Sequence, residues 1–412
     1  MRSKTLNGVC VSIILVAAAL LISSCSANAP ADAITNNDSP IAAQTDAPID
    51  SPVENPTGVG TTTETSEDTS ANNTSNSQNP ETTTAATVVD YLEREIILPE
   101  RIDSVACMYA YIGQVVVLLG GGDKITAAVA GMQRDELLLR KVPGIAEMPV
   151  PFRSSSINIE SLLAVNPDIT LIRYATAANP GELEKLERTG LIYAVVDYYN
   201  IEQQKASIKL VGDIIGRTEQ AERYIEYYDS TLELIESRTS GIPDKDRVSV
   251  YHSVNEVVRT NHSNEISFYI LQAVGCINVS EGFSDMGLGG SLNVNVEQIY
   301  LWDPDIVIAN ESAAVEYLKT NEAFSGLRAV REGKIYQLPV GASRWGHPGS
   351  VETPIAALYI AKLLYPEYFE DIDIRKEIYD FYNEFWEITL DEEDIDSIIS
   401  GVGMREPKDG RQ

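Results

Sequence analysis

The stretch INIESLLAVNPDITLI, residues 157–172, occurs a second time as VNVEQIYLWDPDIVIA, residues 294–309, at a constant offset of 137 residues. In each copy a polar start precedes a short helix, predicted over 160–165 and 297–302. An Asn-Pro-Asp or Asp-Pro-Asp turn then ends the helix, because proline cannot continue it and biases the preceding residue away from the α conformation. The β-branched run that follows predicts a buried strand.

Helix, turn and strand, present twice with further helix and strand alternation around each copy, predict an α/β fold. Two Rossmann-like lobes with largely parallel sheets are expected, with the ligand cleft between them. The expected strands cover 102–107, 125–130, 169–173 and 193–196 in the first lobe, and 248–252, 306–309 and 334–338 in the second.

A single long helix is predicted to connect the lobes. Thr218 is a suitable N-cap, and apolar side chains then recur at helical spacing as far as about residue 237. Because a stiff helical connector limits hinge motion, we expect only modest closure of the cleft.

The N-terminus indicates export. Basic residues precede an apolar run over 9–22, which ends at Ser23-Ser24-Cys25. About 14 apolar residues are fewer than the roughly 20 of a membrane-spanning helix, which disfavours a permanent span. Residues 1–25 therefore resemble a lipoprotein signal peptide, whose lipobox cysteine Cys25 would carry acyl chains that hold the protein at a membrane. Ordinary cleavage near 27–29 is the alternative.

Composition divides the remaining chain. Residues 26–90 are rich in Ser, Thr, Asn, Ala and Pro, contain acidic residues but no Lys, Arg or aromatic residue, and predict a disordered acidic tether. About 320 residues then remain, enough for two domains. We expect an N-terminal lobe over 91–216, the connecting helix over 217–240, a C-terminal lobe over 241–404 and a frayed polar tail over 405–412.

Charge and cysteine content limit the function. The formal net charge of −30 excludes nucleic acid as a partner, since no basic stripe is present to displace phosphate counterions. Only Cys107 and Cys276 remain in the folded part, and the sequence leaves open whether they form a disulfide. Neither of the glycine-rich runs, 120–122 and 287–290, has the spacing of a nucleotide-binding loop.

Four features together resemble the ABC-importer binding proteins for ferric siderophores, haem and cobalamin. They are the lipobox, the doubled helix–turn–strand unit, the connecting helix, and segment 334–339 leading through 343–350 to a helix that ends near 363–366. The resemblance implies a monomeric, lipid-anchored protein on the extracytoplasmic face of the cell membrane. Such a protein hands a metal chelate to a permease dimer driven by a cytoplasmic ATPase, and itself has no enzymatic activity and no cofactor.

In that family a surface glutamate on each lobe docks to arginines of the permease. The motif match places this role on Glu160 and Glu297, which would give a two-point charged contact. The alternative is that each glutamate only complements its helix dipole in the first turn. Their equivalent positions in the two copies favour docking.

Candidate ligand contacts are aromatic or cationic residues in the loops expected to line the cleft. Tyrosine offers a flat face or a metal-binding phenol, arginine pairs with anionic oxygens, and His347 is a candidate axial ligand for haem iron or corrin cobalt. Core packing is the alternative for the aromatic residues. The candidates are Tyr109, Tyr111, Arg134, Arg153, Arg173, Tyr174, His252, Arg259, Arg344, Trp345 and His347.

Three other classes of protein fit the sequence less well. A receptor for a bare divalent metal ion would need several His or carboxylate ligands, and the chain has only three histidines. A secreted hydrolase would be expected to show a nucleophile motif such as G-x-S-x-G, which is absent. An adhesin or sensor without a permease would not need the glutamate pair.

Overall fold

The computed structural model describes residues 86–283, 292–402 and 404–405, all within one compact unit, Gln44–Gln412. The predicted signal peptide, Cys25, the tether as far as residue 85 and tail residues 406–412 lie outside the described residues. The fold begins earlier than the predicted tether boundary, because β1 (Thr87–Val89) already pairs with β2 (Glu95–Ile97). Asp90 closes this hairpin by accepting the N–H groups of Leu92 and Arg94.

Lobe one contains a parallel sheet with the strand order β4-β3-β7-β8. Every strand predicted for this lobe is present, with shorter ends, whereas the short hairpins were not predicted. The strands are β3 (Val105–Cys107), β4 (Ile125–Ala127), β5 (Phe152–Arg153), β6 (Ser156–Ile157), β7 (Ile169–Ile172) and β8 (Tyr193–Val195). The helices are α1 (Ala110–Leu118), α2 (Glu136–Lys141), α3 (Ile159–Val165), α4 (Tyr174–Ala177), α5 (Pro180–Glu187) and α6 (Ile201–Ile215).

Lobe two is built on a mixed sheet with the order β12-β10-β9-β13-β14, in which β11 also pairs with β9. Its central strands are parallel, as predicted. The strands are β9 (Ser249–Ser253), β10 (Arg259–Thr260), β11 (Ile277–Asn278), β12 (Leu292–Asn293), β13 (Ile306–Ala309) and β14 (Ile335–Gln337). The helices are α8 (Ile266–Val274), α9 (Val296–Trp302), α10 (Ser312–Thr320), α11 (Arg328–Arg331), α12 (Thr353–Leu364), α13 (Ile374–Phe381) and α14 (Glu392–Ser400).

The two copies of the repeated sequence fold alike. Asn158 caps α3 by accepting the Ser161 N–H at 2.9 Å, and Asn295 caps α9 by accepting the Gln298 N–H at 2.7 Å. Each helix then ends in a left-handed residue before the proline, with φ of 48° at Asn166 and 37° at Asp303. The same local signals therefore produce the same helix and turn in both lobes.

A serine–aspartate pair also occurs in each lobe, at the start of a central strand. Asp168 accepts the Ser104 N–H at 2.9 Å, and the Ser104 hydroxyl oxygen accepts the Asp168 N–H at 2.8 Å. Asp305 and Ser249 exchange the equivalent pair of hydrogen bonds, both at 2.9 Å. Each pair joins the strand after the Pro-Asp turn to its neighbour in the sheet.

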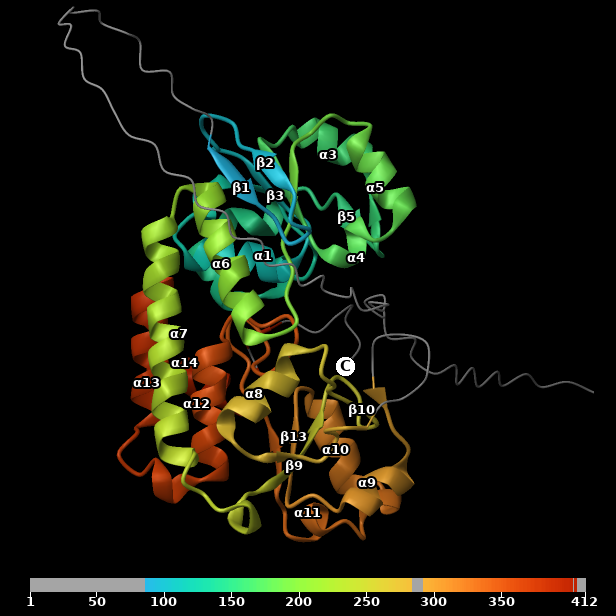
Figure 1. The fold of residues 1–412 in the computed structure, drawn as a ribbon, viewed down its shortest axis with the longest axis vertical. Coiled ribbons are helices and arrows are strands. Elements are labelled where there is room, and N and C mark those ends of the chain that lie inside the picture. Colours follow the sequence, from blue (N-terminus) through green and yellow to red (C-terminus); the bar gives the residue numbers. More distant parts are fainter. Residues whose placement is uncertain (1–85, 284–291, 403, 406–412) are drawn as a thin grey trace, which may run out of the picture. The chain divides into compact units, whose positions relative to one another are not determined.

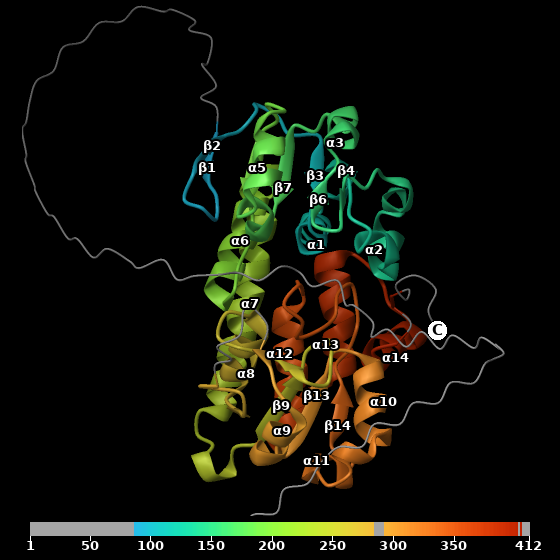
Figure 2. The same cartoon turned by 90° about the vertical axis from the view of Figure 1, so that its right-hand side faces the viewer.

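The connecting helix is α7 (Thr218–Thr239), which confirms the predicted architecture of two lobes and one helical link. It packs against α6, α8 and α12 (Figures 1 and 2). Its N-cap is Arg217 rather than Thr218, because the Thr218 hydroxyl donates backwards to the Asp213 carboxylate at 2.7 Å. Tyr224 and Tyr228 are its largest fully buried side chains.

The C-terminal helices return to lobe one after completing lobe two. Arg140 of α2 pairs with Asp394 of α14 at 2.8 Å, and Lys141 pairs with Glu387 at 2.5 Å. Lobe one is therefore held by this return as well as by α7. Cys107 and Cys276 are both free, and no helix among the described residues is long and apolar enough to span a membrane.

Candidate functional site

Lobe one places a ring and a positive charge at the carboxyl ends of adjacent strands. Tyr109 follows β3 and Arg173 follows β7, and the Arg173 guanidinium carbon lies 4.6 Å from the centroid of the Tyr109 ring. Asp197, after β8, fixes the arginine: its carboxylate lies 3.7 Å from Arg173 Nε and accepts the Tyr174 N–H at 2.8 Å. Tyr109 and Arg173 are both half-buried, so each keeps some accessible surface.

Lobe two positions Arg344 by polar contacts at the ends of its own strands. Arg344 donates to Asn255 Oδ1 at 2.9 Å and forms an ion pair with Glu311, the residue at the N-cap position of α10, after β13. A third contact joins Arg344 to His347 Nε2 at 2.7 Å. The Arg344 side chain is about one-quarter exposed, at 25%. The Arg344 side chain is therefore held in one orientation and remains partly accessible to solvent.

The loop that carries Arg344 is fastened to lobe one through its own backbone. Because the donors are buried side chains, losing one of these bonds would leave a polar group unpaired. The loop therefore holds Arg344 at a defined position relative to lobe one. The bonds run from Gln114 to the Ala342 carbonyl at 2.7 Å, from Tyr198 to Pro348 at 2.8 Å and from Gln204 to Ser350 at 2.8 Å.

His347 is a neutral histidine. Burial, and the positive charges of Arg344, Arg405 and Arg259, hold the pKa of His347 well below 6.5. Its Nδ1 accepts the Gly349 N–H at 3.1 Å, which leaves the ring hydrogen on Nε2. Asn255 Oδ1 lies 3.1 Å from this Nε2 and 2.9 Å from an Arg344 terminal nitrogen, so it accepts a hydrogen bond from both side chains.

Both ring nitrogens of His347 thus have neighbours. An axial metal bond to either one would require a neighbour to move, and that role stays a prediction.

Tyr109 of lobe one reaches the same loop. A Cβ placed on Gly349 would lie 3.0 Å from Tyr109 Oη and 3.6 Å from His347 Nδ1. Only glycine allows this close approach without displacing the tyrosine. The Tyr109–Arg173 pair of lobe one and the Arg344–His347 loop of lobe two therefore face one another.

Arg405, which the sequence assigns to the polar tail, also lies at this junction. Residues Asp135 and Arg405 form an antiparallel bridge, and the Glu136 N–H donates to the Met404 carbonyl at 3.1 Å. Burial and the charges of Arg344 and Arg134 lower the pKa of Arg405 to about 10, against the effect of Asp135. We use the name basic cluster for Arg134, Arg259, Arg344, His347 and Arg405, which act electrostatically on one another through His347 and Arg405.

Three predicted contact residues instead belong to the core. Trp345 is 0% exposed and packs edge-to-face on Tyr359, with ring centroids 5.9 Å apart. His252 is 1% exposed, and burial lowers its pKa to about 4. Tyr111 is 0% exposed and hydrogen-bonds to Ser207 at 2.7 Å. Their burial gives a ligand no surface to contact in this structure, which corrects the sequence-based placement of all three.

The other predicted contact residues lie apart from one another. Arg153 is exposed on the β5–β6 hairpin. Tyr174 is half-buried and packs against Tyr91, with ring centroids 5.8 Å apart and ring planes tilted by 58°. Arg259 lies 3.4 Å from Glu265 while its charge still acts on His347. Of this group, only Arg259 contributes to the basic cluster.

The two candidate docking residues are exposed in matching positions. Glu160 and Glu297 lie in the first turns of α3 and α9. Across residues 86–283 and 292–402, neither forms an ion pair. Leu301, one turn after Glu297, is 79% exposed. Each lobe therefore presents an exposed carboxylate at the same place in its repeat.

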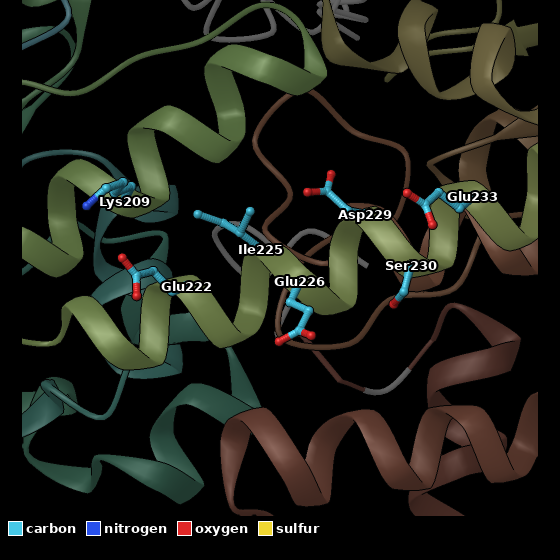
Figure 3. Close-up of a pocket in the computed structure, with 7 residues that line it drawn as sticks. All are labelled: Lys209, Glu222, Ile225, Glu226, Asp229, Ser230 and Glu233. Carbon is cyan, nitrogen blue, oxygen red and sulfur yellow. The ribbon is translucent and has the colours of Figure 1, made fainter.

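A separate shallow hollow of about 540 Å³ lies on α6 and α7, away from the strand ends (Figure 3). Acidic side chains dominate its lining, so its charge is opposite to that of the basic cluster. Within the described part of the chain, no group of three or more His, Cys, Asp or Glu residues is placed to hold a metal ion. The hollow is lined by Lys209, Glu222, Ile225, Glu226, Asp229, Ser230 and Glu233.

Comparison with known proteins gives consistent matches. Residues 105–340 match a family described as periplasmic binding protein. The chain is 21% identical over 321 residues to the molybdate-binding protein MolA of Haemophilus influenzae, covering 73% of this chain and 90% of MolA. The structure of MolA bound to molybdate aligns with a TM-score of 0.66 at 20% identity, over 74% of this chain and 99% of MolA.

Two further solved structures align over similar lengths. A solute-binding protein from Veillonella parvula gives a TM-score of 0.67 at 22% identity, over 76% of this chain and 96% of the other. CeuE of Helicobacter pylori with Ni(II) bound gives a TM-score of 0.63 at 18% identity, over 76% of this chain and 99% of CeuE. At such identities these alignments establish the two-lobed fold.

Proposed function

The chain belongs to the periplasmic binding protein family, and we propose that it is the solute-binding component of an ABC importer that takes up an anionic metal chelate. The observation that carries this proposal is the basic cluster where the two lobes meet. Arg134 comes from lobe one and Arg344 from lobe two, and both act on the half-buried Arg405. The sequence predicts a ferric siderophore, haem or a cobalamin-type chelate, and of these the ferric siderophores and haem expose the carboxylate, catecholate or hydroxamate oxygens that suit the cluster.

The charge of the cluster stands out against the rest of the chain. A protein with a formal net charge of −30 has few reasons to gather guanidinium groups at one half-buried point, because they repel one another. Guanidinium groups pair with anionic oxygens through paired N–H donors. The Tyr109 ring, beside Arg173, adds a flat face for the organic part of a chelate.

A metal oxyanion is the second candidate. MolA, whose printed name is molybdate-binding protein, supports it. A tetrahedral oxyanion would also suit several converging guanidinium groups, but it has no organic part to contact Tyr109. The nickel found with CeuE keeps a bare divalent ion as a third alternative, although a basic site repels a cation.

Membrane attachment and permease docking complete the proposal. Acylation of Cys25 would hold the protein on the extracytoplasmic face of the membrane, and the acidic segment after it would act as a tether. Glu160 and Glu297 would seat the loaded protein on arginines of the permease dimer. Their exposure and matching positions support this role. The protein would act as a monomer without enzymatic activity.

Calorimetric titration tests the solute class directly. The purified chain is titrated with ferric siderophores, haem, cobalamin, molybdate and Ni²⁺, with thermal stability as a second readout, since a bound solute stabilises the folded state. We expect micromolar or tighter binding of an anionic chelate. Binding of molybdate alone would select the second candidate, and binding of Ni²⁺ alone would reject an anionic solute.

The docking role is tested by uptake in cells. The double variant Glu160→Ala/Glu297→Ala should abolish import while leaving solute affinity unchanged. The matched control is Glu184→Ala/Glu316→Ala, which removes one carboxylate from each lobe on α5 and α10, away from α3 and α9. Normal uptake by the first double variant would show that these glutamates do not dock.

A further inference from the structure

The last described residues of the chain form part of the interlobe junction. After α14, the chain runs back to lobe one, where the Met404 side chain is 2% exposed. The Met404 carbonyl accepts the Glu136 N–H, and Arg405 bridges to Asp135. The backbone of Arg405 is therefore fixed on lobe one, although it follows lobe two in sequence.

The Arg405 side chain extends from this point towards the strand-end loops of lobe one. A Cβ placed on Gly131 would lie 3.6 Å from an Arg405 terminal nitrogen and 3.4 Å from the Ala110 Cβ. Ala110 directly follows Tyr109, whose hydroxyl faces the Arg344–His347 loop. Gln114 of α1 donates to the Asp135 carboxylate at 3.2 Å and to the Ala342 carbonyl at 2.7 Å, so the loop that carries Arg344 lies beside the segment to which Arg405 is bridged.

Arg405 differs from most other half-buried arginines in its partners. Arg94, Arg238 and Arg344 each form an ion pair with a carboxylate. Arg405 has none within 4 Å among the residues that the structure describes, although the charges of Asp135 and Glu311 reach it. Arg344 and Arg134 also act on it with the same sign of charge. Of the two acidic neighbours, Glu311 is already paired with Arg344, so Arg405 shares its surroundings with two other guanidinium groups and has no ion-pair partner of its own among the described residues.

We propose that Arg405 is a ligand-binding residue, and that the C-terminal segment thereby completes a three-arginine site with Arg134 and Arg344. This inference rests on the proposed function, because it requires an anionic solute at the basic cluster. Guanidinium groups from three separate segments suit a solute with several anionic oxygens on different sides. The site therefore selects multiply charged anions over singly charged or neutral chelates.

Electrostatics gives the reason for this selectivity. Like charges at half-buried positions repel each other more strongly than in water, because the local dielectric constant is lower. A multiply charged anion removes this repulsion for all three arginines, whereas a neutral chelate leaves it in place. A charge-assisted hydrogen bond from Arg405 corresponds to roughly a ten- to hundred-fold change in affinity.

The test compares Arg405→Gln and Arg405→Lys in the full chain. The probes are a ferric tris-catecholate, molybdate and cobalamin, and affinity is measured by calorimetry at several salt concentrations. Arg405→Gln should weaken the binding anion by roughly ten- to a hundred-fold and reduce the salt dependence of binding. Arg405→Lys keeps the charge but loses the planar pair of N–H donors. Its affinity for the anion should therefore lie between those of Arg405→Gln and the original chain.

The controls separate this inference from the proposed function. Arg188→Gln removes an exposed arginine at the C-cap of α5, whose one ion pair among the described residues is with Glu184, and should leave affinity unchanged. The affinity of Arg405→Gln could be unaltered while Arg134→Gln and Arg344→Gln bind the anion much more weakly. That result would overturn the role proposed for Arg405 and leave the proposed anionic solute in place. If the original chain binds neither anion, the proposed solute class and this inference are both rejected.

Discussion

The two lobes share a framework and differ in what they attach to it. Both place an asparagine cap, a short helix, a left-handed residue before proline and a serine–aspartate pair at equivalent positions. After the equivalent strands the similarity ends: β7 leads to Arg173, whereas β13 leads to Asn310 and Glu311. The repeated part builds the sheet, and the divergent part builds the site, so mutations in the two parts should have different consequences.

The largest expected effect is a loss of stability. It tests whether the loop around Trp345 in lobe two supports the fold, whereas the loop around Tyr109 in lobe one does not. Trp345→Ala should lower the free energy of unfolding by about 3–5 kcal/mol, because it empties a fully buried site. Tyr109→Ala, at a half-buried position in lobe one, should lower it by less than about 2 kcal/mol while weakening solute binding. Urea denaturation measures both values.

Equal losses of stability in these two variants would contradict the distinction between a buried loop anchor and a ligand-facing tyrosine. Phe283→Ala, which removes another aromatic side chain but one that is exposed, is the control for an effect of ring removal itself.

The next effect concerns a buried carboxyl group in lobe two. Burial raises the pKa of Glu352 from 4.5 to about 7, although Ser343 and Ala342 donate hydrogen bonds to it. Between these pH values the folded chain binds more protons than the unfolded chain, so stability decreases as the pH rises. The contribution of Glu352 to this decrease is about 3 kcal/mol.

Glu352→Gln should flatten the dependence of unfolding free energy on pH between about 4.5 and 7, as measured by denaturation at each pH. Lobe one contributes a buried carboxyl of its own, because burial raises the pKa of Asp135 well above 3.8. Asp135→Asn should remove a separate part of the slope. An unchanged slope in both variants would show that neither carboxyl is protonated in the folded protein.

A smaller effect compares the serine–aspartate pairs. Backbone N–H donors, Asp103 foremost, lower the pKa of Asp168. At Asp305 burial alone would raise the pKa, but the hydrogen bonds from Ser249 and the charge of Arg328 outweigh it, so the pKa of Asp305 is also lowered. Both carboxylates therefore stabilise the fold above pH 3.8, and this contribution is lost as the pH falls through their lowered pKa values.

At pH 7, Asp305→Ala should lower the free energy of unfolding by about 2–3 kcal/mol and Asp168→Ala by about 1–2 kcal/mol. The difference is expected because Asp305 has an additional ion pair with Arg328, at 2.5 Å. Thermal and urea unfolding measure the difference. If Asp168→Ala were the more damaging variant, the arginine would not strengthen the second pair.

The sequence predicted the shared framework because its signals are local. Caps, Pro-Asp turns and β-branched runs act within a few residues, so the repeat indicated the same structure twice. The two-residue strands β10 and β12 carry no such signal, because their pairing depends on contacts with β9 and on each other. The strands β9, β13 and β14 were therefore predicted, whereas the two-residue strands β10, β11 and β12 were not.

The candidate site was predicted only in part, for a reason of side-chain direction. A strand end shows where a residue lies along the sheet, but not which face it points to. His252 lies at the end of β9, yet its side chain is 1% exposed and its ring is hydrogen-bonded to Asn310 at 3.0 Å inside the protein. Arg405 was missed because its place depends on a return of the chain from lobe two to lobe one, which no local pattern indicates.

The smallest effect is the most exact test of the repeat. Asn158→Ala and Asn295→Ala each remove one hydrogen bond to a backbone N–H, at 2.9 and 2.7 Å, in the first turn of a seven-residue helix. Loss of such a cap costs about 1 kcal/mol. Because both caps are exposed and begin equivalent helices, the two costs should agree within about 0.5 kcal/mol and add in the double variant. Unequal costs would mean that one lobe depends on its cap more than the other, so that the shared framework would be equivalent in geometry but not in energy.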